Sequence, residues 1–437
     1  MFETIVALAT PPVKSALGII RVSGDDCFKI VSKVFSKDLT KINKREIVYG
    51  FIFDKEKEID QVILLTYVAP HSFTGENSVE IICHGSPLIE DQIIQLLLAN
   101  GARMALNGEF SSRAYLNGKI DLIQAEAIND MINSLTSEAK DLSLIALKGE
   151  NSKIFKPIKE KISEILASIE VNIDYPEYED IEEVSREKVI NVCGEIIKDL
   201  EPLISQSEKD LIYKEGLKIA IVGKPNVGKS SLLNALLDEE KAIVTPIAGT
   251  TRDIVEGDIS INGVPVHLFD TAGLHKSEDV VEKLGIDKAK KAIEDSDLII
   301  FVTDEDKYDE ELFNLIKDKK HIIIHNKADL TKNRKDNEIY ISALNKDIKP
   351  LINEIKKIMG IGELVPHPSF NNTRQLAILK NIVMNLNVAI KDAKDNQPID
   401  LVSTSILIAY NSALELMGEH TKNDLTEEIF SRFCVGK

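Results

Sequence analysis

The chain has 437 residues, of which 43% are apolar and none is tryptophan, and its formal net charge is -18. At roughly 150 residues per domain this length predicts about three domains, and the apolar content excludes a disordered chain. Because an acidic surface repels nucleic acid and anionic membranes, any RNA partner would need a local basic patch or another subunit.

From Thr4 to about Lys119, short β-rich runs such as GIIRVSG, QVILLTYV and SVEIICHG alternate with the helical stretch PLIEDQIIQLLLANG. This alternation predicts a mixed α/β domain over residues 1–119. From about 120 to 215 the strand signals nearly vanish, and apolar residues recur at three- and four-residue spacing, which predicts amphipathic helices.

At Leu217 the pattern changes to a buried strand, and βα alternation continues to about Gly360, which predicts a second α/β domain over 216–365. Helical periodicity returns in 366–437. Since amphipathic helices need a partner, we expect the two helical blocks to pack together. The predicted fold is therefore multidomain α/β plus all-α: an N-terminal α/β domain and a discontinuous helical bundle that carries an inserted Ras-like P-loop domain.

The four cysteines show no CxxC spacing, so the sequence predicts neither a zinc site nor a disulfide framework; they are Cys27, Cys83, Cys193 and Cys434. The chain starts without a basic signal region, and it contains no run of roughly 18 unbroken apolar residues. A cytoplasmic protein is expected.

A phosphate-binding loop is predicted at Gly223–Ser230, GKPNVGKS, between the strand IAIVG and the helix SSLLNALL. Its glycines let backbone N–H groups face phosphates at a helix N-terminus. Lys229 supplies positive charge to the β/γ oxygens, and the Ser230 hydroxyl is a magnesium ligand. The correct strand and helix context makes a chance match improbable.

Further motifs follow in the order found in GTPases: GTTRD, DTAG from Asp270, NKAD from Asn326 and SAL from Ser342. Asp329 can accept two N–H bonds from a guanine edge, whereas adenine would leave this carboxylate unpaired. Guanine is the predicted base. The predicted nucleotide-binding residues are Asn226, Val227, Gly228, Lys229, Ser230, Ser231, Thr245, Pro246, Ile247, Ala248, Gly249, Thr250, Thr251, Asp270, Thr271, Ala272, Gly273, Asn326, Lys327, Ala328, Asp329, Ser342, Ala343 and Leu344.

Leu274 follows the DTAG motif, where Ras-like proteins carry the glutamine that orients the attacking water. A leucine cannot orient water. Another group must do so, and the nearby carboxylates are Glu278, Asp279 and Glu282.

The whole chain resembles the MnmE (TrmE) family of tRNA wobble-uridine modification GTPases, in the TrmE-Era-Era-like branch. The resemblance rests on TIVALATPP, SFTGENSVEIICHG, GEFSSRAYLNGKIDLIQAEAI, TPIAGTTRD, DTAGLHKSEDVVEKLGI and the ending FSRFCVGK. It implies a potassium-activated GTP hydrolase that acts with the flavoprotein MnmG on C5 of U34. It also implies a homodimer through the first domain and a heterotetramer with MnmG.

The resemblance assigns ligands to both metal ions. Potassium would be bound by Asn226, Thr245, Ile247 and Thr250, and magnesium by Ser230 and Thr251. Glu282 would orient the attacking water.

The resemblance also implies a one-carbon donor, 5,10-methylene-tetrahydrofolate, of which 5-formyl-tetrahydrofolate is an analogue. Arg21, Glu80, Lys119 and Lys437 would contact this folate, although isolated charged residues usually lie on solvated surfaces. Two cations suit the glutamate tail, and a carboxylate suits the N–H edge of the pterin. The loop PPVKSALG has fewer glycines than the family pattern, which bears on how closely the backbone approaches the folate.

Cys434 lies three residues from the terminus, where a flexible chain would leave the thiol accessible. The family requires this cysteine. A direct catalytic role and a small buried side chain are the two alternatives.

Two functions remain open. The first is a GTP- and folate-dependent tRNA modification enzyme. The second is a regulatory G protein that controls assembly of an RNA particle without carbon-transfer chemistry, and folate binding by the first domain would distinguish the two.

Overall fold

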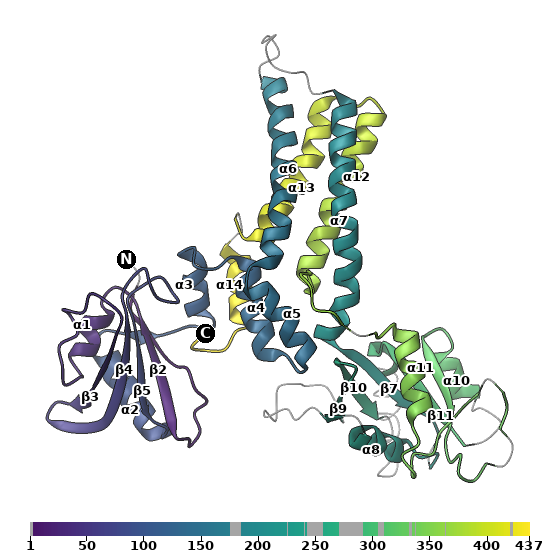
Figure 1. Cartoon of the computed structure of the whole chain (residues 1–437), viewed down its shortest axis with the longest axis horizontal. Coiled ribbons are helices and arrows are strands. Elements are labelled where there is room, and N and C mark those ends of the chain that lie inside the picture. Colours follow the sequence, from purple (N-terminus) through teal and green to yellow (C-terminus); the bar gives the residue numbers. More distant parts are fainter. Residues whose placement is uncertain are drawn as a thin grey trace. The chain divides into compact units, whose positions relative to one another are not determined.

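The computed structural model describes residues 3–174, 185–224, 226–239, 241–242, 257–270, 292–304, 310–331, 334–336, 338–362, 364–419 and 423–437 (Figure 1). The chain divides into two compact units, Met1–Asn129 with Tyr410–Lys437, and Asp130–Ala409.

The first unit is built on a six-stranded sheet in the order β3-β4-β5-β2-β1-β6. Neighbouring strands are antiparallel except β1 and β6, which are parallel. The strands are β1 Ile5–Leu8, β2 Leu17–Ser23, β3 Glu46–Asp54, β4 Lys57–Tyr67, β5 Ser78–His84 and β6 Arg103–Met104.

The two faces of this sheet differ because side chains alternate along each strand. One face packs against α1 (Cys27–Ser32) and α2 (Pro87–Ala99) and buries residues such as Ile20, Leu64 and Ile81. On the other face, at the β3 edge, Ile47, Tyr49 and Ile63 are 76%, 54% and 39% exposed. Tyr49 and Ile63 lie directly opposite each other in the β3–β4 register.

The C-terminal segment packs within this first unit. Phe430 and Phe433 are buried with Ala125 beside Tyr115, where α14 (Asn423–Ser431) meets α3 (Glu109–Leu116) and α4 (Leu122–Asn133). Gly108 precedes α3 with a φ of +64°, and a Cβ there would lie 2.5 Å from the backbone oxygen of Phe430. The close approach of the C-terminal segment therefore requires glycine.

Long helices make up one part of the second unit: α5 Ser137–Leu147, α6 Glu150–Asp174, α7 Arg186–Glu215, α12 Thr373–Lys394 and the start of α13, Ile399–Met417. α12 lies alongside α7, although the whole nucleotide-binding segment separates them in sequence (Figure 1). This pairing confirms the predicted discontinuous bundle with an inserted domain.

The inserted part has a seven-stranded sheet in the order β13-β12-β11-β7-β10-β9-β8. The strands from β13 to β10 are parallel, and β9 and β8 each run antiparallel to the preceding neighbour. The elements are β7 Leu217–Val222, α8 Lys229–Glu239, β8 Lys241–Ala242, β9 Gly257–Ile261, β10 Val264–Asp270, β11 Leu298–Thr303, α10 Glu310–Ile316, β12 His321–His325, β13 Ile339–Tyr340 and α11 Lys349–Met359. The apolar side chains of β7 and β11 alternate between two cores, one with α8 and α11 and one with α10.

The segment that returns from the inserted part to the bundle is bonded to the last turns of α7. Tyr213 donates to the backbone oxygen of Gly362 at 3.0 Å, and the backbone N–H of Phe370 donates to the hydroxyl of Ser207 at 2.9 Å. His367 Nε2 lies 3.1 Å from the carboxylate of Asp210, whose side chain is 1% exposed.

Within the described residues, α13 is long and apolar enough to cross a membrane by length and composition alone. In this structure 44% of its apolar stretch is buried, and the core helix of a globular protein passes the same test. The helix is therefore weak evidence for a membrane span.

Candidate functional site

The predicted phosphate loop lies between β7 and α8, with Pro225 outside the described residues. Lys229 is 5% exposed, and its Nζ donates to the backbone oxygens of Gly223 and Lys224 at 2.8 Å each. The ammonium group therefore lies over the loop at the N-terminus of α8, where backbone N–H groups and a cation together favour an anion. Ser230 follows in the first turn of the helix and is exposed.

Two backbone positions in the loop require special residues. Asn226 has a φ of +64° and Gly228 a φ of +94°, in the left-handed region. A Cβ on Gly228 would lie 2.3 Å from the Nδ2 of Asn326. A side chain at position 228 would displace that amide.

Asn326 connects three of the predicted motifs. Its buried amide donates to the backbone oxygen of Val227 at 2.8 Å, and its Oδ1 accepts from the backbone N–H of Ala343 at 3.1 Å. The phosphate loop and both guanine-side segments are therefore held together by one side chain.

Asp329 lies at the surface, and its Oδ1 accepts a hydrogen bond of 2.6 Å from the Ser342 hydroxyl. Its other oxygen is available to face a base edge. Lys327 has a φ of +61° and forms an ion pair with Asp304, while Leu344 is 81% exposed and Ala328 and Ala343 are buried.

Asp270 ends β10 beside Ile221 of β7, at the carboxyl end of the parallel sheet. This edge is where ligands bind in open α/β sheets. The remaining predicted residues lie outside the described residues: Thr245, Pro246, Ile247, Ala248, Gly249, Thr250, Thr251, Thr271, Ala272, Gly273 and Glu282.

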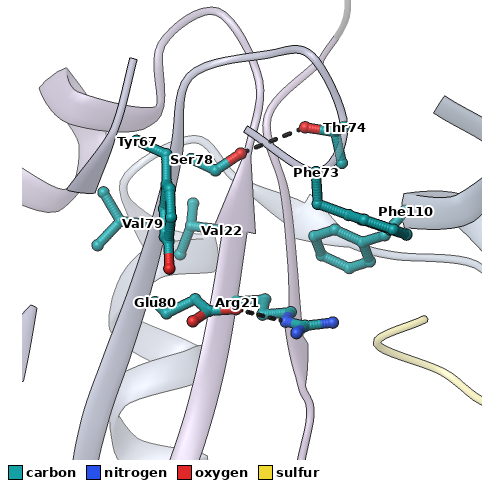
Figure 2. Close-up of a pocket in the computed structure, with 9 residues that line it drawn as sticks. All are labelled: Arg21, Val22, Tyr67, Phe73, Thr74, Ser78, Val79, Glu80 and Phe110. Atoms are coloured by element: carbon teal, nitrogen blue, oxygen red, sulfur yellow. Dashed lines mark hydrogen bonds and ion pairs between the residues drawn. The ribbon is translucent and has the colours of Figure 1, made fainter. Parts of the chain in front are cut away.

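The first unit contains a pocket of about 130 Å³ at the end of β2, β4 and β5 (Figure 2). Its walls include three aromatic rings, those of Tyr67, Phe73 and Phe110. Arg21 and Glu80 lie at its base and form an ion pair of 2.9 Å. These are two of the four residues predicted to contact a folate.

Hydrogen bonds connect the segments of the other two candidate folate residues, Lys119 and Lys437, to this pocket. Lys119 donates to the backbone oxygen of Pro70, in the loop that carries Phe73. Arg21 donates to the backbone oxygen of Gly436 at 3.1 Å, next to Lys437. Backbone bonds from Gly108 to Cys434 and from Phe110 to Lys437 also hold this segment. The segment predicted to be flexible is therefore fixed, because α3 and Arg21 supply donors for its carbonyl groups.

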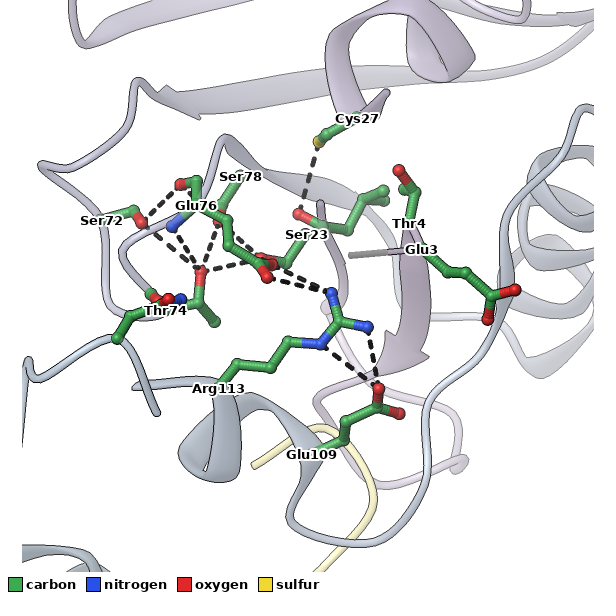
Figure 3. Close-up of polar contacts among 12 residues, drawn as sticks. Glu3, Thr4, Ser23, Cys27, Ser72, Thr74, Glu76, Ser78, Glu109 and Arg113 are labelled. Carbon is green, nitrogen blue, oxygen red and sulfur yellow. Dashed lines mark hydrogen bonds and ion pairs between the residues drawn. The ribbon is translucent and has the colours of Figure 1, made fainter. Parts of the chain in front are cut away.

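A buried network of charged and hydroxyl groups supports the pocket walls (Figure 3). The guanidinium of Arg113, 4% exposed, contacts both carboxylate oxygens of Glu76 at 3.1 and 3.2 Å and Glu109 at 2.8 Å. Glu76 in turn accepts a bond of 2.7 Å from the hydroxyl of Ser23, which also bonds Thr74. The network joins α3, which carries Phe110, to the loop that carries Phe73.

Glu109 is the most strongly perturbed acid of this network. Burial acts to raise its pKa, but hydrogen bonds from Arg103, the Leu106 N–H and Arg113 outweigh burial and lower the pKa to about 2. Glu109 is thus an anion at neutral pH, with two guanidinium partners.

The cysteines divide into two kinds. Cys434 is exposed, as predicted for an accessible thiol, and the other three are buried. Burial raises the pKa of Cys83 to about 11 and that of Cys193 to about 12, and it raises the pKa of Cys27 further still.

Sequence reasoning missed the pocket walls and the Arg113 network. The signal was present in SFTGENS and GEFSSRAYL, which place one buried acid and one buried arginine in segments 37 residues apart. A single sequence does not show that these two charges meet.

The family described as MnmE helical domain matches residues 122–434, and the family described as GTP-binding protein TrmE N-terminus matches residues 4–119. Together these matches extend over nearly the whole chain.

Curated relatives match over the same extent. The tRNA modification GTPase MnmE of Malacoplasma penetrans is 43% identical over 445 aligned positions that cover 100% of both chains. The protein of the same name from Enterococcus faecalis is 39% identical and covers 100% of this chain and 98% of its own.

Solved structures match over part of the chain. The GTPase Era of Aquifex aeolicus, bound to GDP and aluminium fluoride, is 28% identical over 38% of this chain and 65% of its own, with a TM-score of 0.26. The G domain of the FeoB iron transporter of T. maritima is 24% identical over 32% of this chain and 97% of its own, with a TM-score of 0.24.

Proposed function

Because this chain belongs to the MnmE (TrmE) family of tRNA modification GTPases, we propose that it hydrolyses GTP as part of the modification of tRNA. The target is C5 of the wobble uridine, U34, which is converted to a carboxymethylaminomethyl or aminomethyl derivative. The reaction takes place in the cytoplasm.

One observation carries the GTPase part of this proposal: Asn326 bridges Val227 and Ala343, so that Lys229 and Asp329 belong to one site. Lys229 offers a cation and helix N–H groups to phosphates, and Asp329 offers a carboxylate to guanine. The site therefore has separate groups for the two ends of GTP.

Magnesium and potassium fit the donors that the described part of this site presents. Mg²⁺ would be held by Ser230 and Thr251, and K⁺ by Asn226, Thr245, Ile247 and Thr250. Of these, the exposed residues Ser230 and Asn226 are described, and their side chains carry oxygen atoms, the ligands that hard cations prefer. K⁺ would supply the positive charge that an arginine finger provides elsewhere, while Glu282 would orient water.

GTP turnover in KCl and in NaCl tests this proposal. We expect strong stimulation by potassium, which is lost in Asn226→Lys and in Glu282→Ala. The matched control is Asn262→Lys, because Asn262 is another asparagine with positive φ, at 49°, in the exposed β9–β10 turn. Equal GTP turnover in KCl and NaCl, together with wild-type turnover in Glu282→Ala, would contradict the potassium mechanism but not the GTPase activity.

The pocket of the first unit is the proposed site for a tetrahydrofolate that donates one carbon. The three aromatic rings of the pocket can pack against a pterin, and Glu80 can accept hydrogen bonds from the N–H edge of the pterin. Arg21 and Lys119 can bind the carboxylates of the folate. Lys437 would add a third cation near Gly436, which accepts from Arg21. Binding of 5-formyl-tetrahydrofolate to the full chain, and its weakening in Arg21→Ala, tests this site.

A homodimer through the first domain is proposed from the family resemblance and from one face of the sheet. Ile47 and Tyr49, on an edge strand, and Ile63 beside them leave apolar surface in water. Light scattering of the wild type and of Ile47→Asp tests it, since a charge on this face would shift the mass toward a monomer. An unchanged mass in the variant would exclude this face.

The flavoprotein MnmG is the proposed partner, in a heterotetramer, and we propose that it supplies much of the basic surface for tRNA because this chain carries a charge of -18. Tight tRNA binding by the isolated chain at physiological salt would contradict the proposal that MnmG supplies this basic surface.

The alternative, a switch for RNA-particle assembly, shares the nucleotide site but has no use for folate. The pocket with Arg21 and Glu80 favours the enzyme. Absence of folate binding by a chain that still hydrolyses GTP would favour the switch.

A further inference from the structure

A cation lies beside the pocket that neither the motifs nor the pocket walls include. Arg45 immediately precedes β3, and its guanidinium carbon lies 4.7 Å from the centroid of the Tyr67 ring. Its NH2 nitrogen also lies 3.4 Å from the Tyr67 hydroxyl. Tyr67 is a wall of the pocket, so Arg45 is held at that wall by a cation–π contact.

The segment that leads to Arg45 is strongly basic in a protein that is acidic as a whole. Lys37, Lys41 and Lys44 are exposed, as is Arg45, and Asp38 is the acid among them. Lys44 contacts Glu46 at 3.9 Å, and Glu80, the acid that lines the pocket, is already paired with Arg21. The surface beside Tyr67 is therefore positive.

We propose that Arg45, followed by Lys44 and Lys41, binds the oligo-γ-glutamate tail of the reduced folate whose ring occupies the pocket. This inference rests on the folate part of the proposed function. The pocket, at about 130 Å³, is smaller than the roughly 300–1,000 Å³ typical of sites that enclose a whole ligand. A folate must then extend out of it, and each added glutamate brings one more carboxylate.

The contact with Tyr67 is what favours a folate tail over the phosphates of RNA as the ligand. The guanidinium of Arg45 lies against Tyr67, a wall of the pocket, where it can meet the part of a ligand that extends out of the pocket. Its planar set of N–H donors suits a carboxylate. Phosphates of RNA would be satisfied by the same charges anywhere on the surface.

The test compares the affinities of monoglutamyl and triglutamyl 5-formyl-tetrahydrofolate for the full chain. We expect the triglutamate to bind roughly 3- to 10-fold more tightly, as one or two exposed ion pairs allow, and the difference to shrink as salt rises. Arg45→Ala should remove most of this advantage, and Arg45→Lys should restore part of it. The matched control is Lys57→Ala, which removes an exposed cation at the opposite end of β4 from Tyr67 and should keep the advantage.

Each other outcome overturns a different statement. Equal affinities for the two folates in the wild type, or an advantage that survives Arg45→Ala, would refute the role of Arg45 and leave the folate site standing. No binding of either folate would remove the folate site itself. Loss of tRNA binding by the complex of Arg45→Ala with MnmG, with an intact triglutamate advantage, would assign these cations to RNA instead.

Discussion

The amide of Asn326 donates to the backbone oxygen of Val227 at 2.8 Å, and thereby ties the guanine-side loop after β12 to the phosphate loop after β7. The same side chain accepts from the Ala343 N–H, so its truncation leaves one buried acceptor and one buried donor without their partner. The two ends of the nucleotide site are thus positioned by one residue that lies 4% exposed.

Asn326→Ala should therefore weaken the binding of GDP and of GTP to the same extent. Loss of two buried hydrogen bonds predicts roughly a 10- to 100-fold lower affinity, which a fluorescent nucleotide titration measures. Asn262→Ala, in an exposed turn, is the control. A folded Asn326→Ala protein with wild-type affinity would show that the site does not depend on this bridge.

Asp329→Asn should change the base preference. The amide presents N–H donors where the carboxylate accepts from guanine, and xanthine carries a carbonyl oxygen where guanine carries its amino group. We expect GTP to bind roughly 100-fold or more weakly and XTP to bind better, because a mismatched polar site discriminates strongly. The Ser342 bond survives, since the amide oxygen can accept it.

Competition between GTP and XTP for the same labelled nucleotide measures that change. Asp336→Asn alters an exposed acid between β12 and β13 and should leave the preference for GTP intact. Equal losses for both nucleotides in Asp329→Asn would indicate a distorted loop rather than a new specificity.

The nucleotide site was predictable because each of its motifs is a contiguous segment and the motifs follow one another in a fixed order, even though Asn326 reaches Val227 across 99 residues. The strand, loop and helix around Lys229 are contiguous, Asp270 ends β10, and Asn326 directly follows β12. The discontinuous bundle could also be predicted, because an amphipathic stripe such as that of α12 must find a partner.

The pocket was less predictable because its contacts are distant in sequence. Arg21 reaches the carbonyl oxygen of Gly436 across 415 residues, and Arg113 reaches Glu76 across 37. Periodicity indicates which face of an element is apolar, but it does not specify which buried charges pair. The contact of Arg45 with Tyr67 could not be predicted either, because an arginine before a strand is usually expected to be a solvated surface charge.

The thiols should differ sharply in reactivity. At pH 8 we expect one thiol per native chain, that of Cys434, to react quickly with an aromatic disulfide reagent. The raised pKa values and burial of Cys27, Cys83 and Cys193 keep them slow, and all four should react in denaturant. Rapid reaction of native Cys434→Ser would show that a buried thiol becomes exposed.

Glu109 should contribute stability that depends on pH in a defined direction. Its folded pKa of about 2 lies below the ordinary 4.5, so the folded state favours the anion. The contribution is complete above about pH 4.5 and is lost as the pH falls toward 2. Glu109→Gln removes an anion that two arginines share, and should cost about 1–3 kcal/mol in the free energy of unfolding at pH 7.

Urea titrations at several pH values measure this effect. The gap in the free energy of unfolding between wild type and Glu109→Gln should narrow below pH 4.5. Glu56→Gln, in the exposed β3–β4 turn, should show little gap at any pH. A gap for Glu109→Gln that is constant from pH 7 to pH 3 would mean that packing, and not the charge of Glu109, holds α3 against the pocket.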